Sequence, residues 1–484
     1  MYRHLKMVII LSLFSIQGFS ATTISIEAGK VVKKVESGPA GAVLCWLLDS
    51  DIHRMRDTSF EDAMLEMKVG SLRFPYGFLS NNYLWHTPPF DDVSGGLRPK
   101  VAAKSGNPSK WSWAVNRDGS FKGAMDFDEF MSLCIRRNIK PVVCVNVMSY
   151  KYDGGPTYSY LKTSATEWVR YANNKGYKGI YWQLGNEQDH HRDIMSQDEY
   201  VDLYADFSAA MKTVDPNIMV GPGILSFTSY YKAVIDKSPD LVDFVSVHQY
   251  NWGPKLSSYD DWKNDPQDYL NNLRKAQDGI AAKPDLEIIV TETNAYSGSK
   301  LPGEGHTCRA LWWFELLMNE IAFKNVSYSY FWGTHSPWSG QNQKQNGGAL
   351  LLDNNNNRTQ MGEVNMIVNT HLGGQELVEV DRVNGFIRAY ACRNPQNDHV
   401  TVFLLNKNDQ WEDGVEVVIN SFPEIKSYNR WEFKGKSWDD YNPVYSENGS
   451  IQISANSFTT SLEPLSVTII EISNELIRSN DPRP

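Results

Sequence analysis

The sequence lacks the features that mark several broad classes of protein. It has no basic excess, since 47 Lys and Arg stand against 57 Asp and Glu, a formal net charge of −10. A nucleic-acid partner is therefore not expected. After the first twenty residues, no stretch approaches the roughly 18 uninterrupted apolar residues of a membrane-spanning helix, so no membrane span is expected. The five cysteines are scattered without metal-ligand spacing, which predicts buried thiols, although an exported protein can form one disulfide among them.

The first twenty residues have the pattern of a signal peptide. Arg3 and Lys6 precede an apolar run, Val8 to Phe14, that is too short to cross a bilayer. Gly18 and Ser20 fit the small-residue rule for a cleavage site. Removal of two positive charges changes the formal charge from −10 to −12. We therefore expect a secreted or periplasmic protein.

Eight near-continuous apolar runs predict the strands of a parallel sheet that is buried on both faces. Helical stretches separate several of these runs, and eight strands close a (β/α)₈ barrel. The predicted strands are residues 42–48, 70–74, 140–147, 179–184, 217–221, 241–247, 287–291 and 328–332.

The pattern changes after the barrel to short runs with period-two alternation, which is typical of an antiparallel β-sandwich. Glu447 to Gly449 is expected to be a turn between two of these runs. The chain is thus predicted to contain a signal peptide (1–20), a strand that joins the sandwich (21–38), the barrel (39–373) and the sandwich (374–484).

Two of the predicted barrel strands end in a glutamate. Glu187 follows the strand at 179–184, and Glu292 follows the strand at 287–291. Reacting groups of barrel enzymes come from the carboxyl ends of strands, and an unpaired buried carboxylate costs several kcal/mol. A pair of carboxylates roughly 5–5.5 Å apart performs retaining glycoside hydrolysis. The alternative is a purely structural role, in which both glutamates form salt bridges at the barrel rim.

The stretch Leu184-Gly-Asn-Glu187, together with Glu292 in Thr-Glu-Thr-Asn, resembles clan A glycoside hydrolases. The resemblance implies that Glu187 is the acid/base and Glu292 the nucleophile. The stretch from Leu72 to Trp85 is similar to a motif of family 51 α-L-arabinofuranosidases, and so is Val145-Asn146. That family usually has Gly-Gly after its Arg-x-Pro motif, where this chain has Tyr76 and a glycine. Agarase- and porphyranase-type families therefore stay open.

Further side chains are expected to support the two glutamates. Arg73 and Tyr250 are placed to hydrogen-bond Glu292, and Asn186 is placed to hold the sugar 2-hydroxyl. Burial and the charge of Glu292 are expected to raise the pKa of Glu187. The predicted substrate-binding residues are Arg73, Asn146, Asn186, His248, Tyr250, Trp332, Tyr76 and Trp85.

Two further features bear on the choice of ligand. The pair His190-His191 beside Asp189 has no spaced partners, so we interpret it as a solvated loop rather than a metal site. Aromatic residues make up 12% of the chain, with 15 Trp and 24 Tyr, and part of that excess is expected to form surfaces on which sugar rings stack. No metal and no cofactor are expected.

The sequence therefore predicts a secreted retaining glycoside hydrolase, similar to α-L-arabinofuranosidases, that acts on a plant or algal polysaccharide or oligosaccharide by double displacement. An endo-acting hydrolase of an algal galactan, of the β-agarase or β-porphyranase type, is the alternative activity. A carbohydrate-binding protein that has lost catalysis is the alternative from a different class.

Overall fold

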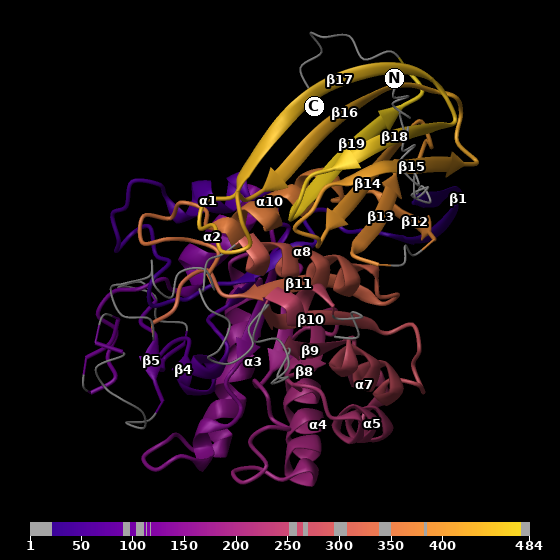
Figure 1. Ribbon diagram of the computed structural model, residues 1–484. Coiled ribbons are helices and arrows are strands. Elements are labelled where there is room, and N and C mark those ends of the chain that lie inside the picture. Colours follow the sequence, from indigo (N-terminus) through magenta and orange to yellow (C-terminus); the bar gives the residue numbers. More distant parts are fainter. Residues whose placement is uncertain are drawn as a thin grey trace, which may run out of the picture.

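The computed structural model describes residues 22–90, 97–102, 111–112, 114–116, 118–250, 259–264, 270–294, 307–337, 350–381 and 385–475. The predicted signal peptide lies outside these residues. Figure 1 shows a barrel of strands and helices with a large sheet packed against one side of it. In the described part of the chain, no helix combines the length and the apolar character that crossing a bilayer requires. The five cysteines are buried free thiols.

The barrel contains eight parallel strands, as the sequence predicts. Its sheet has the order β8-β7-β6-β3-β2-β11-β10-β9. The β8–β9 seam is closed by single backbone bonds, from Asp243 N to Val220 O at 3.0 Å and from His248 N to Leu225 O at 2.9 Å. The strands are β2 (Ala40–Val43), β3 (Ser71–Phe74), β6 (Lys140–Val145), β7 (Tyr181–Leu184), β8 (Met219–Pro222), β9 (Phe244–Tyr250), β10 (Glu287–Asn294) and β11 (Val326–Trp332).

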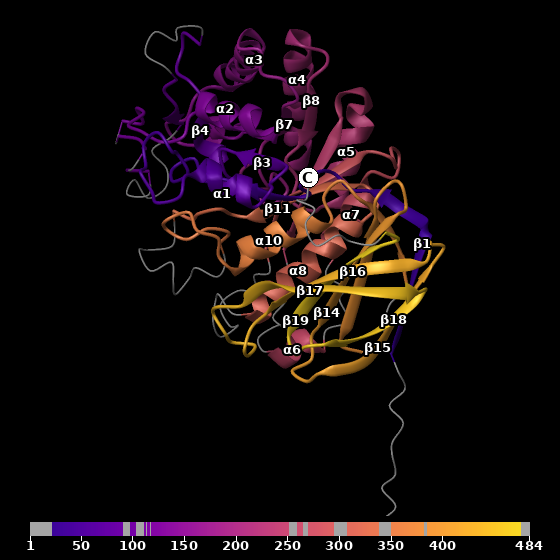
Figure 2. The ribbon, with the colours of Figure 1, turned by 90° about the horizontal axis from the view of Figure 1, so that it is seen from above.

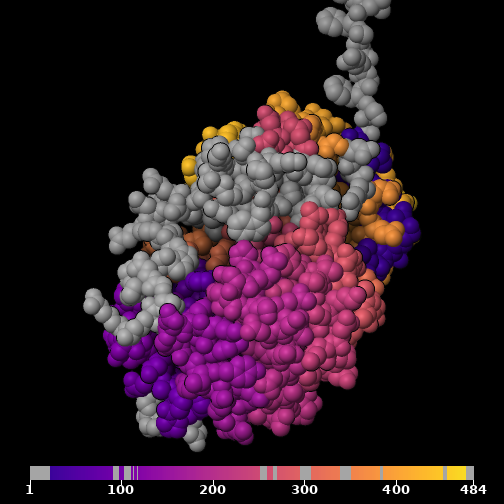
Figure 3. All heavy atoms as spheres, turned by 90° about the horizontal axis from the view of Figure 1, so that it is seen from below, coloured from indigo at the N-terminus to yellow at the C-terminus, as the bar shows by residue number. Residues whose placement is uncertain are grey.

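Helices cover the outside of the barrel, and several begin at a side chain that accepts a backbone N–H. Asp126, Thr157 and Ser196 do so for α2, α3 and α4. Figure 3 shows the barrel part of the chain, coloured from purple to pink, as one continuous surface on this side of the molecule. The helices are α1 (Phe60–Glu66), α2 (Phe127–Arg137), α3 (Tyr158–Asn174), α4 (Gln197–Val214), α5 (Thr228–Lys237), α6 (Tyr259–Lys263), α7 (Asn271–Gly279), α8 (Thr307–Ala322) and α10 (Gln360–His371). Short elements are η1 (Phe78–Asn82), β4 (Tyr83–Leu84), β5 (Lys100–Val101), η3 (Ser149–Lys151) and η4 (Pro239–Leu241).

The second sheet has nine strands in the order β17-β16-β19-β14-β13-β12-β1-β15-β18. Its two ends face each other across an apolar core, since Tyr428 of β16 stacks on Phe458 of β18 with ring centroids 5.2 Å apart. The strands are β1 (Thr23–Lys34), β12 (Glu376–Val380), β13 (Ile387–Arg393), β14 (His399–Asn406), β15 (Glu412–Asn420), β16 (Ile425–Lys434), β17 (Val444–Ala455), β18 (Ser457–Leu462) and β19 (Ser466–Ser473). The predicted fold class, a barrel with a sandwich completed by an N-terminal strand, is confirmed.

Two details of the sandwich differ from the expectation. The N-terminal strand β1 pairs antiparallel with β12 but parallel with β15, so the sheet is not purely antiparallel. Glu447 to Gly449 does not form a turn between strands, because it lies inside β17, where β16 and β17 shift register. The left-handed φ of Gly449, 86°, accommodates this irregularity within a continuing strand.

The barrel and the sandwich share a polar and apolar interface at α8 and α10, which lie between them in Figure 2. Glu315 of α8 is fully buried and pairs with Lys407 at 3.2 Å and with Arg388 at 3.0 Å. His371 of α10 contacts Glu471 of β19 at 2.7 Å. Charges buried this deeply are tolerated when they are paired. These contacts therefore fix the position of the sandwich relative to the barrel.

Candidate active site

The two glutamates predicted to carry the chemistry lie together at the carboxyl ends of β7 and β10. One oxygen of Glu187, one oxygen of Glu292 and a ring nitrogen of His248 all lie within 4.8 Å of one another. Glu187 stands just beyond the end of β7 with a left-handed φ of 51°, which turns the chain sharply at this point. Glu292 is part of β10 itself, and only 3% of its surface is exposed.

Both oxygens of Glu292 accept hydrogen bonds from predicted partners. Arg73 Nη1 donates to Oε1 at 2.6 Å, and the Tyr250 hydroxyl donates to Oε2 at 2.8 Å. Arg73 is fully buried, so its charge acts on Glu292 with little screening by water. Glu187, His248 and Glu292 also have the spacing of metal ligands. The guanidinium beside Glu292 repels a cation, so the arrangement suits a held nucleophile better than a metal site.

Arg73 also positions Asn186. Its Nη2 donates to Asn186 Oδ1 at 2.6 Å, and its Nε donates to Gln183 Oε1 at 3.1 Å. Since the amide oxygen of Asn186 is occupied, its Nδ2 is the group left to bind a ligand. That buried nitrogen has no hydrogen-bond partner among the residues that the structure describes. Gln183 was missed at the sequence level, although a polar residue inside the apolar run Tyr181–Leu184 is the signal that would have found it.

Glu187 and Glu292 lie in different environments. Glu187 is joined to His248 Nδ1 at 2.8 Å. Burial is the main cause that raises the pKa of Glu187, and the negative charge of Asp189 adds to it. Asp189 thus has the role that we expected of Glu292. Burial lowers the pKa of His248 to about 4, so the imidazole is neutral. A neutral imidazole can either donate a hydrogen bond to Glu187 or accept one from it.

Asp189 anchors the turn that carries Glu187. Its buried carboxylate accepts from the backbone N–H groups of Leu225 at 2.7 Å, Ser226 at 2.8 Å and Phe227 at 2.8 Å. The carbonyl of Leu225 in turn accepts from the backbone of His248. A series of hydrogen bonds therefore runs from Asp189 through Leu225 at the β8–β9 seam to His248 and Glu187.

Trp332 lies at the end of β11, next to the nucleophile. Its ring packs on Tyr76 with centroids 4.3 Å apart, and both rings flank Gly77. Tyr76 is only 1% exposed, so it supports Trp332 from behind rather than forming the floor of the site. A Cβ at Gly77 would come 2.6 Å from Trp332 Cη2 and still closer to Glu292 Oε1. Glycine is therefore required where this loop passes the nucleophile.

The structure does not bring two of the predicted substrate-binding residues to the glutamates. Asn146 uses its side chain within its own turn, where Oδ1 accepts from the Met148 and Ser149 backbone and Nδ2 donates to Ser149 Oγ at 2.8 Å. Trp85 is 1% exposed and stacks on Trp168 of α3 with centroids 5.8 Å apart. Its indole N–H donates to the Ser164 carbonyl at 2.9 Å. Both residues stabilise the barrel in this structure.

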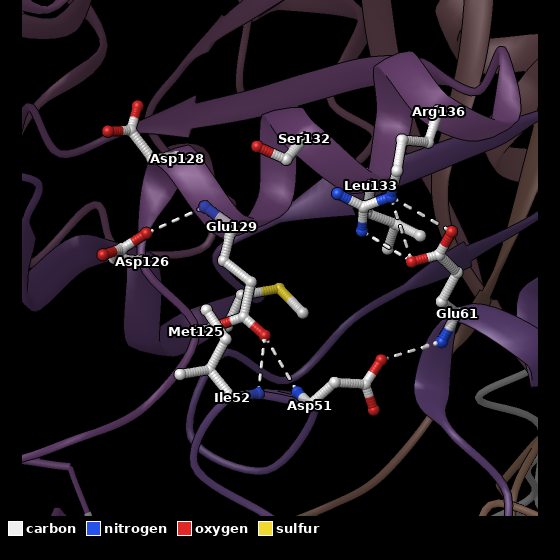
Figure 4. Close-up of a pocket in the computed structure, with 10 residues that line it drawn as sticks. All are labelled: Asp51, Ile52, Glu61, Met125, Asp126, Asp128, Glu129, Ser132, Leu133 and Arg136. Carbon is white, nitrogen blue, oxygen red and sulfur yellow. Dashed lines mark hydrogen bonds and ion pairs between the residues drawn. The ribbon is translucent and has the colours of Figure 1, made fainter.

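An acidic cavity of about 350 Å³ lies apart from these residues, beside α1 and α2 (Figure 4). Burial raises the pKa of Glu129 in this cavity to about 7. The Glu129 carboxylate already accepts from Ser50 Oγ and from the backbone of Asp51 and Ile52. Glu129 thus stabilises the loop after β2.

Comparison with known proteins agrees with this geometry. A family model described as "Glycosyl hydrolases family 39" matches residues 123–332, a range that contains both Glu187 and Glu292. An intracellular exo-α-(1→5)-L-arabinofuranosidase of Acetivibrio thermocellus is 26% identical over 263 residues, 48% of this chain and 47% of that protein. The enzyme of the same name from Halalkalibacterium halodurans is 29% identical over 236 residues, 45% of this chain and 44% of that protein.

The resemblance to clan A glycoside hydrolases is confirmed. Over the residues that it matches, the description of the family model agrees with the predicted enzyme class, a glycoside hydrolase. The chain spans about half the length of the curated relatives that it matches.

Solved structures match the fold over nearly the whole chain. An α-L-arabinofuranosidase from Thermotoga maritima, in complex with arabinose, has a TM-score of 0.72 at 16% identity and covers 94% of this chain and 100% of that chain. A family 44 xyloglucanase from Paenibacillus polymyxa has a TM-score of 0.64 at 15% identity over 94% of this chain and 100% of that chain. At these identities the likeness shows the fold alone.

Proposed function

We propose that the protein hydrolyses glycosidic bonds with retention of anomeric configuration. The observation that carries the proposal is the close approach of Glu187 and Glu292. One carboxylate oxygen of Glu187 lies within 4.8 Å of one carboxylate oxygen of Glu292. Retaining enzymes hold their carboxyl groups roughly 5–5.5 Å apart, whereas inverting enzymes leave roughly 6.5–9.5 Å for a water molecule. The different environments of the two carboxyl groups support different roles for them.

In the first step, Glu187 donates its proton to the glycosidic oxygen while Glu292 attacks the anomeric carbon. The bond to the leaving group breaks, and a glycosyl ester forms on Glu292. The Tyr250 hydroxyl releases the oxygen that attacks, while Arg73 keeps the other oxygen in place. The free donor of Asn186 holds the sugar 2-hydroxyl, a contact that strengthens in the transition state.

In the second step, Glu187 is a carboxylate and removes a proton from water. The resulting nucleophile attacks the anomeric carbon, the ester bond to Glu292 breaks, and Glu187 is protonated again. His248, being neutral, can hydrogen-bond Glu187 in both of its protonation states. This contact keeps the acid/base in one position through the cycle.

An α-L-arabinofuranoside is the proposed substrate, in a plant or algal polysaccharide or in oligosaccharides derived from one. The names of the two curated relatives and the motif from Leu72 to Trp85 support this choice. Those relatives are described as intracellular. For this chain we propose export, which rests on the signal-peptide pattern of residues 1–20.

Incubation with a panel of polysaccharides tests the proposal. Arabinan, arabinoxylan, agarose, porphyran and carrageenan are offered to the wild-type protein and to Glu292→Ala, and the products are sized. We expect release of arabinose by the wild type and none by Glu292→Ala. Release of galactan oligomers would instead indicate an endo-acting galactan hydrolase. Binding of a polysaccharide without turnover would refute hydrolysis.

A further inference from the structure

An exposed aromatic side chain follows directly after the glycine that touches the nucleophile. Phe78 begins η1 and is 46% exposed, which is unusual for so large an apolar side chain next to a buried charged site. The neighbouring Gly77 lies against the Trp332 ring and Glu292. An exposed ring, Phe78, therefore stands one residue from the point where the chain approaches Trp332 and Glu292.

His191 places Phe78 on the side of the acid/base. The two rings lie 6.2 Å apart between centroids at an interplanar angle of 46°. His191 follows Glu187 by four residues and lies close enough that its positive charge would lower the pKa of that carboxyl. Its Nε2 atom is buried and has no hydrogen-bond partner in the described part of the chain. His190 is exposed and His191 is half-buried in the loop after Glu187, so His191 contributes to the surroundings of that carboxyl.

The side of the site matters because the two glutamates act on different parts of a substrate. Glu292 attacks the anomeric carbon, whereas Glu187 protonates the oxygen of the group that leaves. A leaving sugar consequently departs along the Glu187 side. Phe78 and His191 offer that sugar an apolar face and a polar nitrogen, which is the combination that recognises a sugar ring.

We propose that Phe78 and His191 form the subsite for the leaving-group sugar. The sugar ring stacks on Phe78, and one of its hydroxyl groups hydrogen-bonds His191 Nε2. Trp332, which lies beside Gly77 and near Glu292, serves the sugar that is transferred to Glu292. The inference rests on the proposed function and deepens it, because it makes the enzyme selective for bonds between two sugars.

Two substrates that share the transferred sugar test the subsite. One is arabinobiose, whose leaving group is a sugar, and the other is arabinofuranosyl fluoride, whose leaving group has no ring. We expect Phe78→Ala to lower kcat/KM for the disaccharide about tenfold, as the loss of one ring contact implies. The fluoride should be hydrolysed at the wild-type rate, which also shows that the variant is folded. His191→Ala should lower the disaccharide rate in the same selective way.

Trp411→Ala is the matched control, because Trp411 is an aromatic residue of the sandwich with 54% exposure. It should leave both rates unchanged. Equal losses on the two substrates in Phe78→Ala would place Phe78 with the transferred sugar and overturn the inference. An unchanged rate on both substrates would overturn it as well. Failure of the wild type to hydrolyse the fluoride would instead refute the proposed function, and this inference with it.

Discussion

The passage of Gly77 beside the nucleophile gives a sharp prediction for Gly77→Ala. The added methyl group would lie 2.6 Å from Trp332 Cη2 and closer still to Glu292 Oε1, whereas ordinary contacts of a Cβ begin near 3.4 Å. Glu292 is held from its other sides by Arg73 and Tyr250, so it cannot move away without losing those hydrogen bonds. The substitution must therefore displace the nucleophile, the Trp332 ring or the loop itself.

The size of the effect follows from the displacement that relieves the overlap, which is about 1 Å. A misplacement of about 1 Å at a reacting group costs on the order of a hundredfold in rate. We expect kcat on the preferred arabinofuranoside to fall about a hundredfold, while the thermal unfolding midpoint falls by only a few degrees. Initial-rate kinetics and a thermal melt on the same preparation measure both quantities.

Gly176→Ala separates the close approach from a general cost of replacing glycine. Gly176 ends α3 with a φ of 75° and has no atom within 4 Å of the position of a new Cβ. This control should lose stability, about 1 kcal/mol, because of its left-handed backbone, and keep its kcat. A Gly77→Ala variant with wild-type kcat would refute the packing of this loop against Glu292.

Three further predictions concern titrating groups. Asp189→Asn removes a negative charge that raises the pKa of Glu187, so the alkaline limb of the kcat/KM profile should move to lower pH; an unmoved limb would contradict this role. In Glu187→Gln, that limb should disappear, because Glu187 must be protonated to donate, and a persisting limb would point to another acid. Burial raises the pKa of Glu320 from 4.5 to about 8. Between these pH values the folded protein keeps a proton on Glu320 that the unfolded chain releases. The contribution of Glu320 to the free energy of unfolding is therefore lost as pH rises from 4.5 to about 8. Glu320→Gln should reduce that pH dependence in denaturant unfolding, and an unchanged slope would exclude Glu320 as its source.

The barrel and its two glutamates could be predicted because both depend on local pattern. Strands buried on both faces appear as continuous apolar runs, and a carboxylate that ends such a run needs a partner or a function. Arg73, Tyr250, His248 and Asn186 were predicted with them, since they also stand at strand ends.

Contacts that depend on packing between distant segments could not be predicted from the sequence. Trp85 stands in the same motif as Arg73, but only the fold shows that its ring packs under α3. Tyr76 was expected to bind substrate, because nothing in the sequence reveals that its ring is buried against Trp332. Asp189 could not be linked to the backbone near Leu225 without knowing how the barrel seam closes.

The sandwich shows the same limit. The strands β16 and β18 lack a clear period-two alternation in the sequence, because polar residues interrupt it, as Lys426 and Asn429 do in β16. The turn expected at Glu447 to Gly449 rested on residues that favour turns and equally suit a bulge within a strand. Pairing partners decide between these outcomes, and they lie far away in the sequence.

Trapping of the covalent intermediate tests the central claim most directly. An arabinofuranoside carrying fluorine at C2 and a good leaving group slows the second step, so the glycosyl ester accumulates and can be located by peptide mass spectrometry. We expect one sugar per protein, attached to Glu292, and no label in Glu292→Gln. Attachment to Glu187, or release of the inverted anomer without any covalent adduct, would contradict it.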